Sequence, residues 1–187
     1  MINLLPDGGQ LLNLIKARQS DRGYSDKPVE SDKIERILEA ARLAPSACNA
    51  QPWKFIVVSE PETKKQIAEA ASAKALGMNT FVYEAPMFIV IVREKPNLTS
   101  RIGSAVKDKD YSLMDIGITS GFISLQACAE GLGSCIMGWF NEKLVKKILG
   151  IPSGKRVELI VAVGYASKEY RQKRRKPAGE VISFEKY

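Results

Sequence analysis

Two amide side chains on a stiff loop are the first candidates for chemistry in this sequence of 187 residues. Asn49 and Gln51 lie in the nonapeptide Pro45-Ser46-Ala47-Cys48-Asn49-Ala50-Gln51-Pro52-Trp53, which precedes an apolar run at 55–58. Each proline restricts its own backbone and that of the residue before it. An amide offers two donors and an acceptor, which suits a flat heterocycle edge that alternates C=O and N–H. The loop therefore predicts a binding site. The alternative is a helix stop followed by a strand start, with Trp53 an ordinary core residue.

Two basic segments near the ends of the chain are further candidates. Arg18-Gln19-Ser20-Asp21-Arg22 follows an apolar helical segment at 11–15, and Lys173-Arg174-Arg175-Lys176-Pro177 follows a strand that ends at Gly164-Tyr165-Ala166. Between residues 168 and 176, six basic residues stand against one acid, and the whole chain has a formal charge of +7. Such a run is typical of a solvated mobile segment, a nucleic-acid patch or a phosphate-binding arm. An arginine at a helix end, such as Arg18, commonly serves only the helix dipole.

Together these segments resemble the nitroreductase family of flavin mononucleotide (FMN) oxidoreductases. The likeness rests on the Arg-x-Ser-x-Arg opening, the Pro-Ser-x-x-Asn-x-Gln-Pro-Trp loop, a Gly-Leu-Gly-Ser-Cys-Ile-Met-Gly segment at 131–138 and the basic tail. They occur in the expected order over almost the whole chain. The resemblance implies an α/β fold, an α+β sandwich with a mixed central sheet flanked by helices. It also implies one flavin-binding domain over 1–187, with 166–187 as a basic C-terminal arm, and a homodimer with the flavin at or near the interface.

The resemblance also implies which residues contact the cofactor. Arg18 and Arg175 would each donate in a planar fork to the FMN phosphate, Lys173 would add a point charge, and Ser20 a hydroxyl donor. Arg22 would lie near the N1–C2=O edge of the ring and tune the flavin electrostatically, with no catalytic residue certain beyond it. The full expected cofactor set is Arg18, Gln19, Ser20, Arg22, Asn49, Gln51, Ile136, Met137, Gly138, Lys173 and Arg175.

The residues of the loop and of segment 136–139 have more specific expected roles, and some of them allow a structural interpretation instead. Asn49 and Gln51 would contact the polar side of the ring and the ribityl chain, and Gly138 best matches a backbone N–H that points at N5, with Met137 beside it. Met137 and Trp139 alternate along a strand and are typical of a core. Gln19 stands where the family often has a second basic residue, which weakens the phosphate grip slightly.

The implied reaction is a ping-pong hydride transfer. NADH or NADPH would reduce the flavin at N5, and an acceptor such as a nitroaromatic or a quinone would reoxidise it at the same site. The composition agrees with cofactor chemistry, because the chain has no histidine and so lacks Ser-His-Asp and Cys-His catalysis. No metal site is expected either, since the three cysteines are scattered.

The rest of the composition limits which binding partners and which cellular location are expected. An odd number of cysteines without a C-x-x-C pair, and no signal-peptide pattern after Met1, favour a cytoplasmic protein. No run approaches the roughly 18 apolar residues of a membrane span, so no membrane is expected. Gly131-Leu132-Gly133 lacks the third glycine of a dinucleotide fingerprint. A nucleic-acid-binding module is disfavoured because few aromatic residues interleave the basic tail.

Two further alternatives stay open. One is a specialised relative on the same scaffold, such as a dehalogenase or an enone or azo reductase. The other is a flavin-binding protein without turnover. The choice between NADH and NADPH, the physiological acceptor and the residues of the substrate pocket between Leu76 and Ser104 do not follow from the sequence.

Apolar periodicity predicts the elements that position these segments. Helices are expected at 31–43, from a capping box at Ser59 and Glu62 to about residue 76, at 111–131, and at 142–149 after an Asn141 cap. Strands are expected at 55–58, 87–92, 134–139 and 157–163, and segment 95–109 is polar. Gly117, Gly121, Ser124 and Cys128 place small residues on one stripe of the longest helix. The stripe indicates either tight packing within the chain or a partner subunit. The order of the strands does not follow from the sequence.

Overall fold

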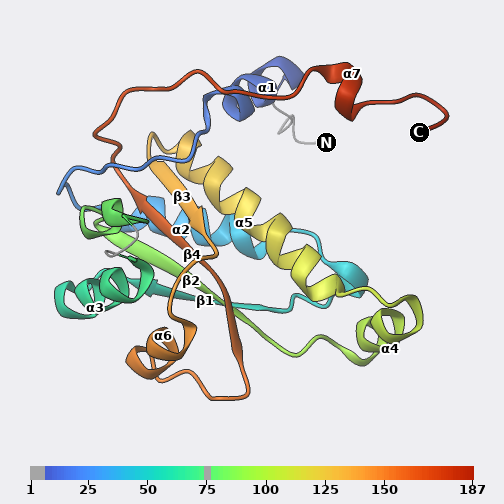
Figure 1. Ribbon diagram of the computed structural model, residues 1–187, viewed down its shortest axis with the longest axis horizontal. Coiled ribbons are helices and arrows are strands. Elements are labelled where there is room, and N and C mark those ends of the chain that lie inside the picture. The colour runs from blue at the N-terminus through green and yellow to red at the C-terminus, as the bar shows by residue number, and fades with distance from the viewer. Residues whose placement is uncertain (1–6, 74–76) are drawn as a thin grey trace.

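A central antiparallel sheet organises the fold (Figure 1). The computed structural model describes residues 7–73 and 77–187. The strand order is β1-β2-β4-β3, where β1 is Trp53–Val58, β2 is Met87–Arg93, β3 is Gly133–Met137 and β4 is Arg156–Gly164. All three strand pairs are antiparallel. Among the residues described, parallel pairing is limited to an isolated bridge between Ser20 and Ser134. The sheet is therefore mixed only through segment 18–22.

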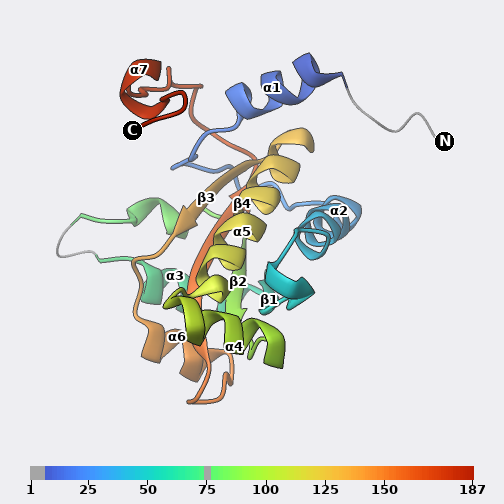
Figure 2. The ribbon, with the colours of Figure 1, turned by 90° about the vertical axis from the view of Figure 1, so that its right-hand side faces the viewer.

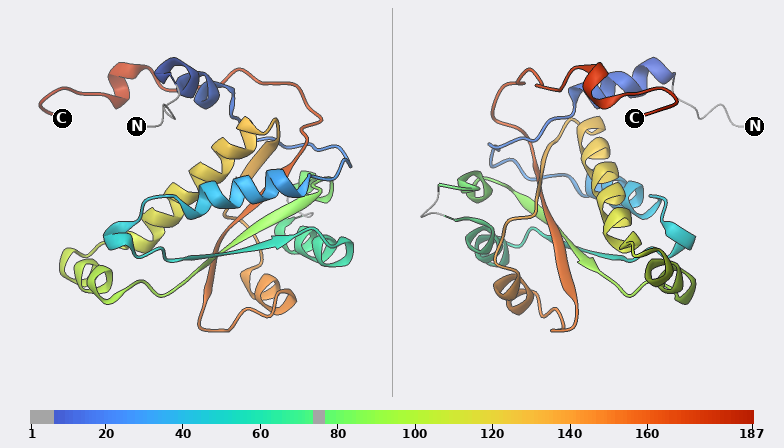
Figure 3. Two further views of the ribbon diagram at one scale, coloured as in Figure 1. Left: turned by 180° about the vertical axis from the view of Figure 1, so that it is seen from behind. Right: turned by 45° about the vertical axis from the view of Figure 1, so that its right-hand side comes forward.

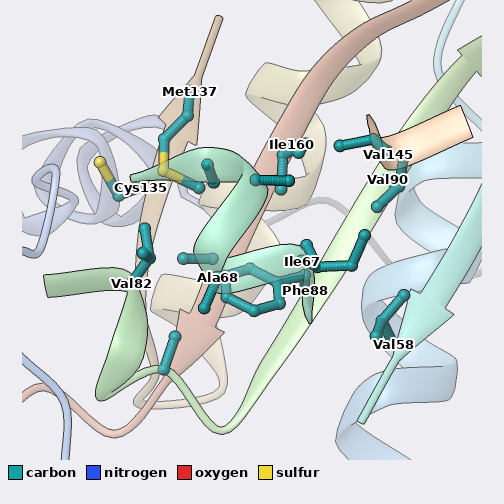
Figure 4. Packing of buried hydrophobic residues seen from close by; sticks show 14 of the residues in the cluster. Val58, Ile67, Ala68, Val82, Phe88, Val90, Cys135, Met137, Val145 and Ile160 are labelled. Carbon is teal, nitrogen blue, oxygen red and sulfur yellow. The ribbon is translucent and has the colours of Figure 1, made fainter. Parts of the chain in front are cut away.

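Helices cover both faces of the sheet, as the expected sandwich requires (Figure 2). One face carries α2 (Ser31–Arg42) and α5 (Tyr111–Ala129), and the other carries α3 (Pro61–Ala71) and α6 (Glu142–Ile148). Strand β2 shows why its sequence is a continuous apolar run. Successive side chains point to opposite faces, so one set packs under α2 and α5 and the alternate set under α3 and α6: Met87, Ile89 and Ile91, then Phe88, Val90 and Val92. Figure 4 shows Phe88 and Val90 among Ile67, Val145 and Ile160.

The N-terminal helix and the C-terminal segment lie together beyond the sheet. Helix α1 (Gly8–Ala17) has no buried residue, and the short helix α7 (Ala178–Val181) lies at the same end of the molecule (Figures 1 and 3). The Tyr170 hydroxyl donates to the Lys16 carbonyl at 3.0 Å, which ties the arm to α1. Helix α4 (Leu98–Lys107) lies at the other end of α5 (Figure 3). None of the helices in the described ranges is long and apolar enough to cross a bilayer.

Most expected elements are present, with differences mainly at their ends. The capping box at Ser59 was wrong: the Glu60 carboxylate accepts from the backbone N–H groups of Glu62 and Thr63, because Pro61 occupies the first helical turn. That helix ends at Ala71, and residues 74–76 lie outside the described residues. Helix α4 forms within the segment noted only as polar, since Asn97 caps it through a bond from the Ser100 N–H, 2.9 Å long. Its apolar residues Leu98, Ile102 and Val106 recur at helical spacing, but they stay exposed and join neither face of the core.

The end of β4 depends on a glycine that admits no side chain. A Cβ at Gly164 would lie 2.4 Å from ring carbons of Pro86 and 3.2 Å from the Tyr24 ring. We expect Gly164→Ala to lower the free energy of unfolding by about 1–3 kcal/mol, because the backbone must shift to relieve the overlap. Urea unfolding measures the change. Gly154→Ala is the matched control, since a Cβ there meets no atom within 4 Å; equal losses in the two variants would contradict the steric explanation.

Candidate functional site

The two basic segments of the sequence meet in one cavity of about 520 Å³. Segment 18–22 leaves α1 and forms one wall, and residues 171–175 of the C-terminal arm form the other. The lining residues are Arg18, Gln19, Ser20, Arg22, Arg171, Gln172, Lys173, Arg174 and Arg175. The volume is within the range of small-molecule sites. Six of the eleven expected cofactor residues therefore lie around one space, although about 150 positions separate the two segments in the chain.

The end of α1 positions two of the cations. The Arg18 backbone N–H donates to the Leu14 carbonyl and closes the helix. The Lys173 ammonium group donates to the carbonyls of Ile15 and Lys16, at 2.6 and 2.5 Å. A cation there satisfies free carbonyl groups and complements the helix dipole. The arm is thus fixed to α1 by Lys173, which is a role beyond the point charge expected from the sequence.

The cavity concentrates positive charge without a compensating acid in its lining. Among the ion pairs within 7–73 and 77–187, none involves Arg18, Arg22, Arg171, Lys173, Arg174 or Arg175. Desolvation lowers the pKa of Lys173, and the charges of Arg18 and Arg175 lower it further. These groups repel one another until an anion enters. The arrangement therefore suits a dianionic phosphate, which can take several charge-assisted hydrogen bonds.

Asp21 and Arg171 are site residues that the sequence reasoning missed. Asp21 is only 7% exposed, and its carboxylate accepts from the Ser134 N–H at 3.3 Å and from Gln19 Nε2 at 2.7 Å. The Arg171 N–H donates to Gln19 Oε1, and its guanidinium donates to the Ser20 carbonyl at 3.3 Å. Arg171 was visible only as one of several basic residues. For Asp21 the sequence held no signal, because its partner Ser134 is far along the chain.

Arg22 lies where this cavity meets a second one of about 370 Å³. The second cavity is lined also by residues 77–81, Glu84 and Lys168. It lies partly in the region between Leu76 and Ser104 where the sequence left the substrate pocket undefined. Arg22 is exposed, so its guanidinium is accessible to a ligand that occupies either space.

Strand β3 brings the next candidates toward segment 18–22. The Ser20–Ser134 bridge joins the start of β3 to this segment, and the Asp21 N–H donates to the Ser134 carbonyl at 2.9 Å. Ile136 on the strand and Gly138 just after it are exposed. Met137 is buried, which confirms the core interpretation of its side chain, whereas Trp139 is 57% exposed and its core interpretation was wrong. The strand ends at Met137, so Trp139 no longer follows the alternation.

The nonapeptide loop is strained and polar. Cys48, Asn49 and Gln51 have φ values of 52°, 50° and 46°, in the left-handed region that non-glycine residues rarely adopt. Such strain is a feature of binding and catalytic loops. Gln51 Nε2 donates to Asn49 Oδ1 at 3.1 Å, and both residues are exposed. Trp53 is buried and stacks on Phe55 with 6.2 Å between ring centroids, so it is a core residue.

A buried carboxylate anchors the loop to the first turns of α5. Asp115 is 3% exposed, and its Oδ1 accepts from the Ala47 N–H at 3.0 Å. Arg18, in contrast, lines a small cavity with Cys128, near the last residue of α5. Asp115 and Cys128 are thirteen positions apart, which is roughly 20 Å along an α-helix. One chain therefore does not bring Asn49 and Gln51 to the Arg18 cavity.

Comparison with known proteins places this arrangement in a family. The nitroreductase family model matches residues 15–77 and 71–165. A protein of Thermus thermophilus named NADH dehydrogenase is 30% identical, over 88% of this chain and 91% of its own. An iodotyrosine deiodinase of Haliscomenobacter hydrossis is 25% identical, over 88% of this chain and 83% of its own.

A solved structure gives the same result for the fold. An FMN-dependent nitroreductase from Clostridium difficile R20291 superposes with a TM-score of 0.78 at 29% identity, and the match covers 94% of this chain and 99% of that one. The sandwich around the antiparallel sheet is therefore the nitroreductase fold. With the family match extending from residue 15 to residue 165, this chain belongs to the nitroreductase family.

Proposed function

We propose that this protein is an FMN-dependent oxidoreductase that uses NAD(P)H and an oxidising acceptor such as a nitroaromatic or a quinone. The observation that carries the proposal is the cavity of six uncompensated cations formed by segment 18–22 and the arm. When bound, FMN supplies a ring that accepts hydride at N5 and returns it to an acceptor. The names of the family relatives support oxidation–reduction chemistry for this scaffold.

The residues of the cavity fit the phosphate end of FMN. Arg18 and Arg175 offer planar pairs of donors, and Ser20 offers a hydroxyl group. Lys173 contributes charge while it holds the arm on α1. In the mechanism, these groups bind and orient the cofactor, and Arg22 places a positive charge at the junction of the two cavities. A fixed cation near the ring stabilises negative charge that develops on reduction.

A second copy of the chain completes the proposed site. Met114, Ile118 and Phe122 are 51%, 41% and 38% exposed along α5, and a Cβ at Gly117 or Gly121 would meet no atom within 4 Å. Tight packing within the chain therefore does not explain these two glycines, and the stripe suits the close approach of a partner helix. We propose a homodimer in which the partner's loop brings Asn49 and Gln51 to the cavity formed by Arg18 and the arm.

Replacing Arg22 tests its role as an electrostatic tuner. We expect Arg22→Ala to make the FMN reduction potential more negative by roughly 30–60 mV, because the reduced flavin loses a neighbouring positive charge. A redox titration against a reference dye measures the shift. Lys65→Ala, which removes an exposed cation from α3 outside both cavities, is the control. Equal potentials in the Arg22 variant and the wild type would remove Arg22 from this role.

The absorbance spectrum between 300 and 550 nm is the experiment that tests the proposed function. A flavin spectrum that bleaches under anaerobic conditions with NADH or NADPH, and returns with a nitroaromatic or quinone, is the expected result and identifies the donor. A colourless protein that takes up no added FMN would overturn the proposal. A yellow protein that neither donor reduces would instead show a flavin-binding protein without turnover.

A dehalogenase is the second candidate function, because a deiodinase is among the relatives that match over most of their length. An acceptor profile distinguishes it. Release of halide from a halogenated aromatic acceptor by the reduced enzyme, faster than reduction of a nitroaromatic, would favour dehalogenation.

A further inference from the structure

A chain of side-chain hydrogen bonds joins three distant segments beneath the cationic cavity. The Ser134 N–H of β3 donates to Asp21 Oδ2, Gln19 Nε2 donates to Asp21 Oδ1, and the Arg171 N–H of the arm donates to Gln19 Oε1. The distances are 3.3, 2.7 and 3.0 Å. This relay runs from the edge of the sheet to the arm through two side chains of segment 18–22.

The Asp21 carboxylate sets the orientation of the Gln19 amide. An ionised carboxylate only accepts hydrogen bonds, so it binds the NH₂ side of the amide and leaves the oxygen to face the arm. A reversed amide would turn its oxygen toward the carboxylate and its NH₂ group toward the Arg171 N–H. Both contacts would be lost. The relay is therefore directional, and the contact with the arm at the Arg171 N–H depends on the acid at residue 21.

The surroundings of Asp21 fix the carboxylate itself. A Cβ at Gly133 would lie 2.7 Å from Asp21 Oδ2, so only glycine leaves room for the acid against β3. The Tyr24 hydroxyl donates to the Asp21 carbonyl at 3.0 Å. Burial strengthens these hydrogen bonds and makes an unpaired partner costly.

We propose that Gln19 and Asp21 are positioning residues that dock the C-terminal arm at Arg171, beside the contacts that Tyr170 and Lys173 make with α1, and so help to place the arm cations in the cavity. The inference rests on the proposed function, because it assigns the arm cations to the FMN phosphate. It replaces the direct cofactor contact expected of Gln19 with an action through Arg171. Asp21 lies beside the cations without pairing with them, since both its oxygens are occupied by neutral donors.

Swapping the acid and the amide between positions 19 and 21 tests the relay. In Gln19→Glu, a carboxylate oxygen faces the Asp21 carboxylate in place of the NH₂ group, and the two repel. We expect the Arg171 backbone amide to exchange with deuterium about tenfold faster, as loss of one hydrogen bond implies. In Gln19→Glu/Asp21→Asn, the new amide at position 21 donates to the new carboxylate at position 19 and accepts from the Ser134 N–H, so all three bonds re-form. The exchange rate of this double variant is expected to return to within about twofold of the wild-type rate.

Gln172→Glu is the matched control. It adds the same negative charge to the lining of the same cavity but lies outside the relay. We expect it to weaken FMN binding without changing exchange at Arg171. Hydrogen exchange is measured by mass spectrometry on the purified protein with and without added FMN.

The outcomes separate the inference from the proposed function. Unchanged exchange in Gln19→Glu, or a double variant no slower than the single one, would overturn the relay. If the Arg171 amide exchanged as fast in Gln172→Glu as in Gln19→Glu, the relay would also be overturned, because the added charge alone would then explain the effect. The flavin-free measurement tests arm docking by itself, whereas a wild-type protein that binds no FMN contradicts only the proposed function.

Discussion

Replacing Arg18 and Arg175 together by alanine is expected to leave a folded protein that loses FMN on gel filtration. The two arginines line opposite walls of the cationic cavity, one at the end of α1 and one on the arm. A hydrogen bond to a charged group contributes about 1.5–3 kcal/mol, so the loss of both contacts lowers FMN affinity by about 10²–10⁴-fold. Neither side chain belongs to the hydrophobic core, and the thermal midpoint of the flavin-free protein should change little.

A matched double variant separates this local effect from the loss of net charge. Arg42→Ala/Lys65→Ala also removes two cations, on α2 and α3, outside the cavity. It should retain stoichiometric FMN. Riboflavin, which lacks the phosphate, should bind equally well to the wild type and to the Arg18/Arg175 variant. Retention of FMN by that variant would show that the cavity does not hold the phosphate.

Mixing two inactive variants is expected to restore activity. One carries Arg18→Ala/Arg175→Ala and the other Asn49→Ala/Gln51→Ala. Because the strained loop docks at Asp115 and the cationic cavity lies at the other end of α5, each proposed site takes its two halves from different subunits. A mixed dimer then holds one site with all four substitutions and one site with none. If subunits pair at random in a two-fold dimer, about a quarter of all sites are intact.

The measurement compares NAD(P)H oxidation before and after the variants are unfolded and refolded together. About a quarter of wild-type activity is the expected result, and each variant refolded alone is the control. No gain on mixing, with mixed dimers shown by native mass spectrometry, would place both halves of the site in one subunit. It would also contradict the role of the partner's loop while leaving the cationic cavity in place.

Local sequence patterns predicted most of the helices and strands of this protein. Periodicity of two and of 3.6 residues indicates the core strands and most helices, because a face that is buried must repeat its apolar residues at the period of its element. The apolar run 87–92 predicts a buried strand, and it lies at the centre of the sheet with both faces covered. Clustered charge is also visible in sequence alone, but it was the resemblance to a family that predicted the two basic segments as parts of a phosphate site, because charge by itself left a mobile segment and a nucleic-acid patch open.

Sequence patterns predicted the ends of helices and strands, and helices with little buried surface, less well. The cap at Glu60 competes with Ser59 next to it, and only the backbone geometry selects one. Helix α4 was missed although Leu98, Ile102 and Val106 recur at helical spacing, because polar and charged residues outnumber them in segment 95–109. Trp139 leaves the alternation because β3 ends two residues earlier.

The sequence by itself determined the types and positions of the chemical groups: the arginines at residues 18, 22 and 175, the amides at 49 and 51, and the absence of histidine. Only the tertiary structure decided which of them meet. It joined Arg18 to the arm, connected the arm to β3 through Gln19 and Asp21, and placed the amide loop at the far end of α5. The physical reason is that the type of a strand or helix follows from neighbouring residues, whereas the convergence of segments more than a hundred residues apart follows from strand order and helix length, which local patterns do not contain.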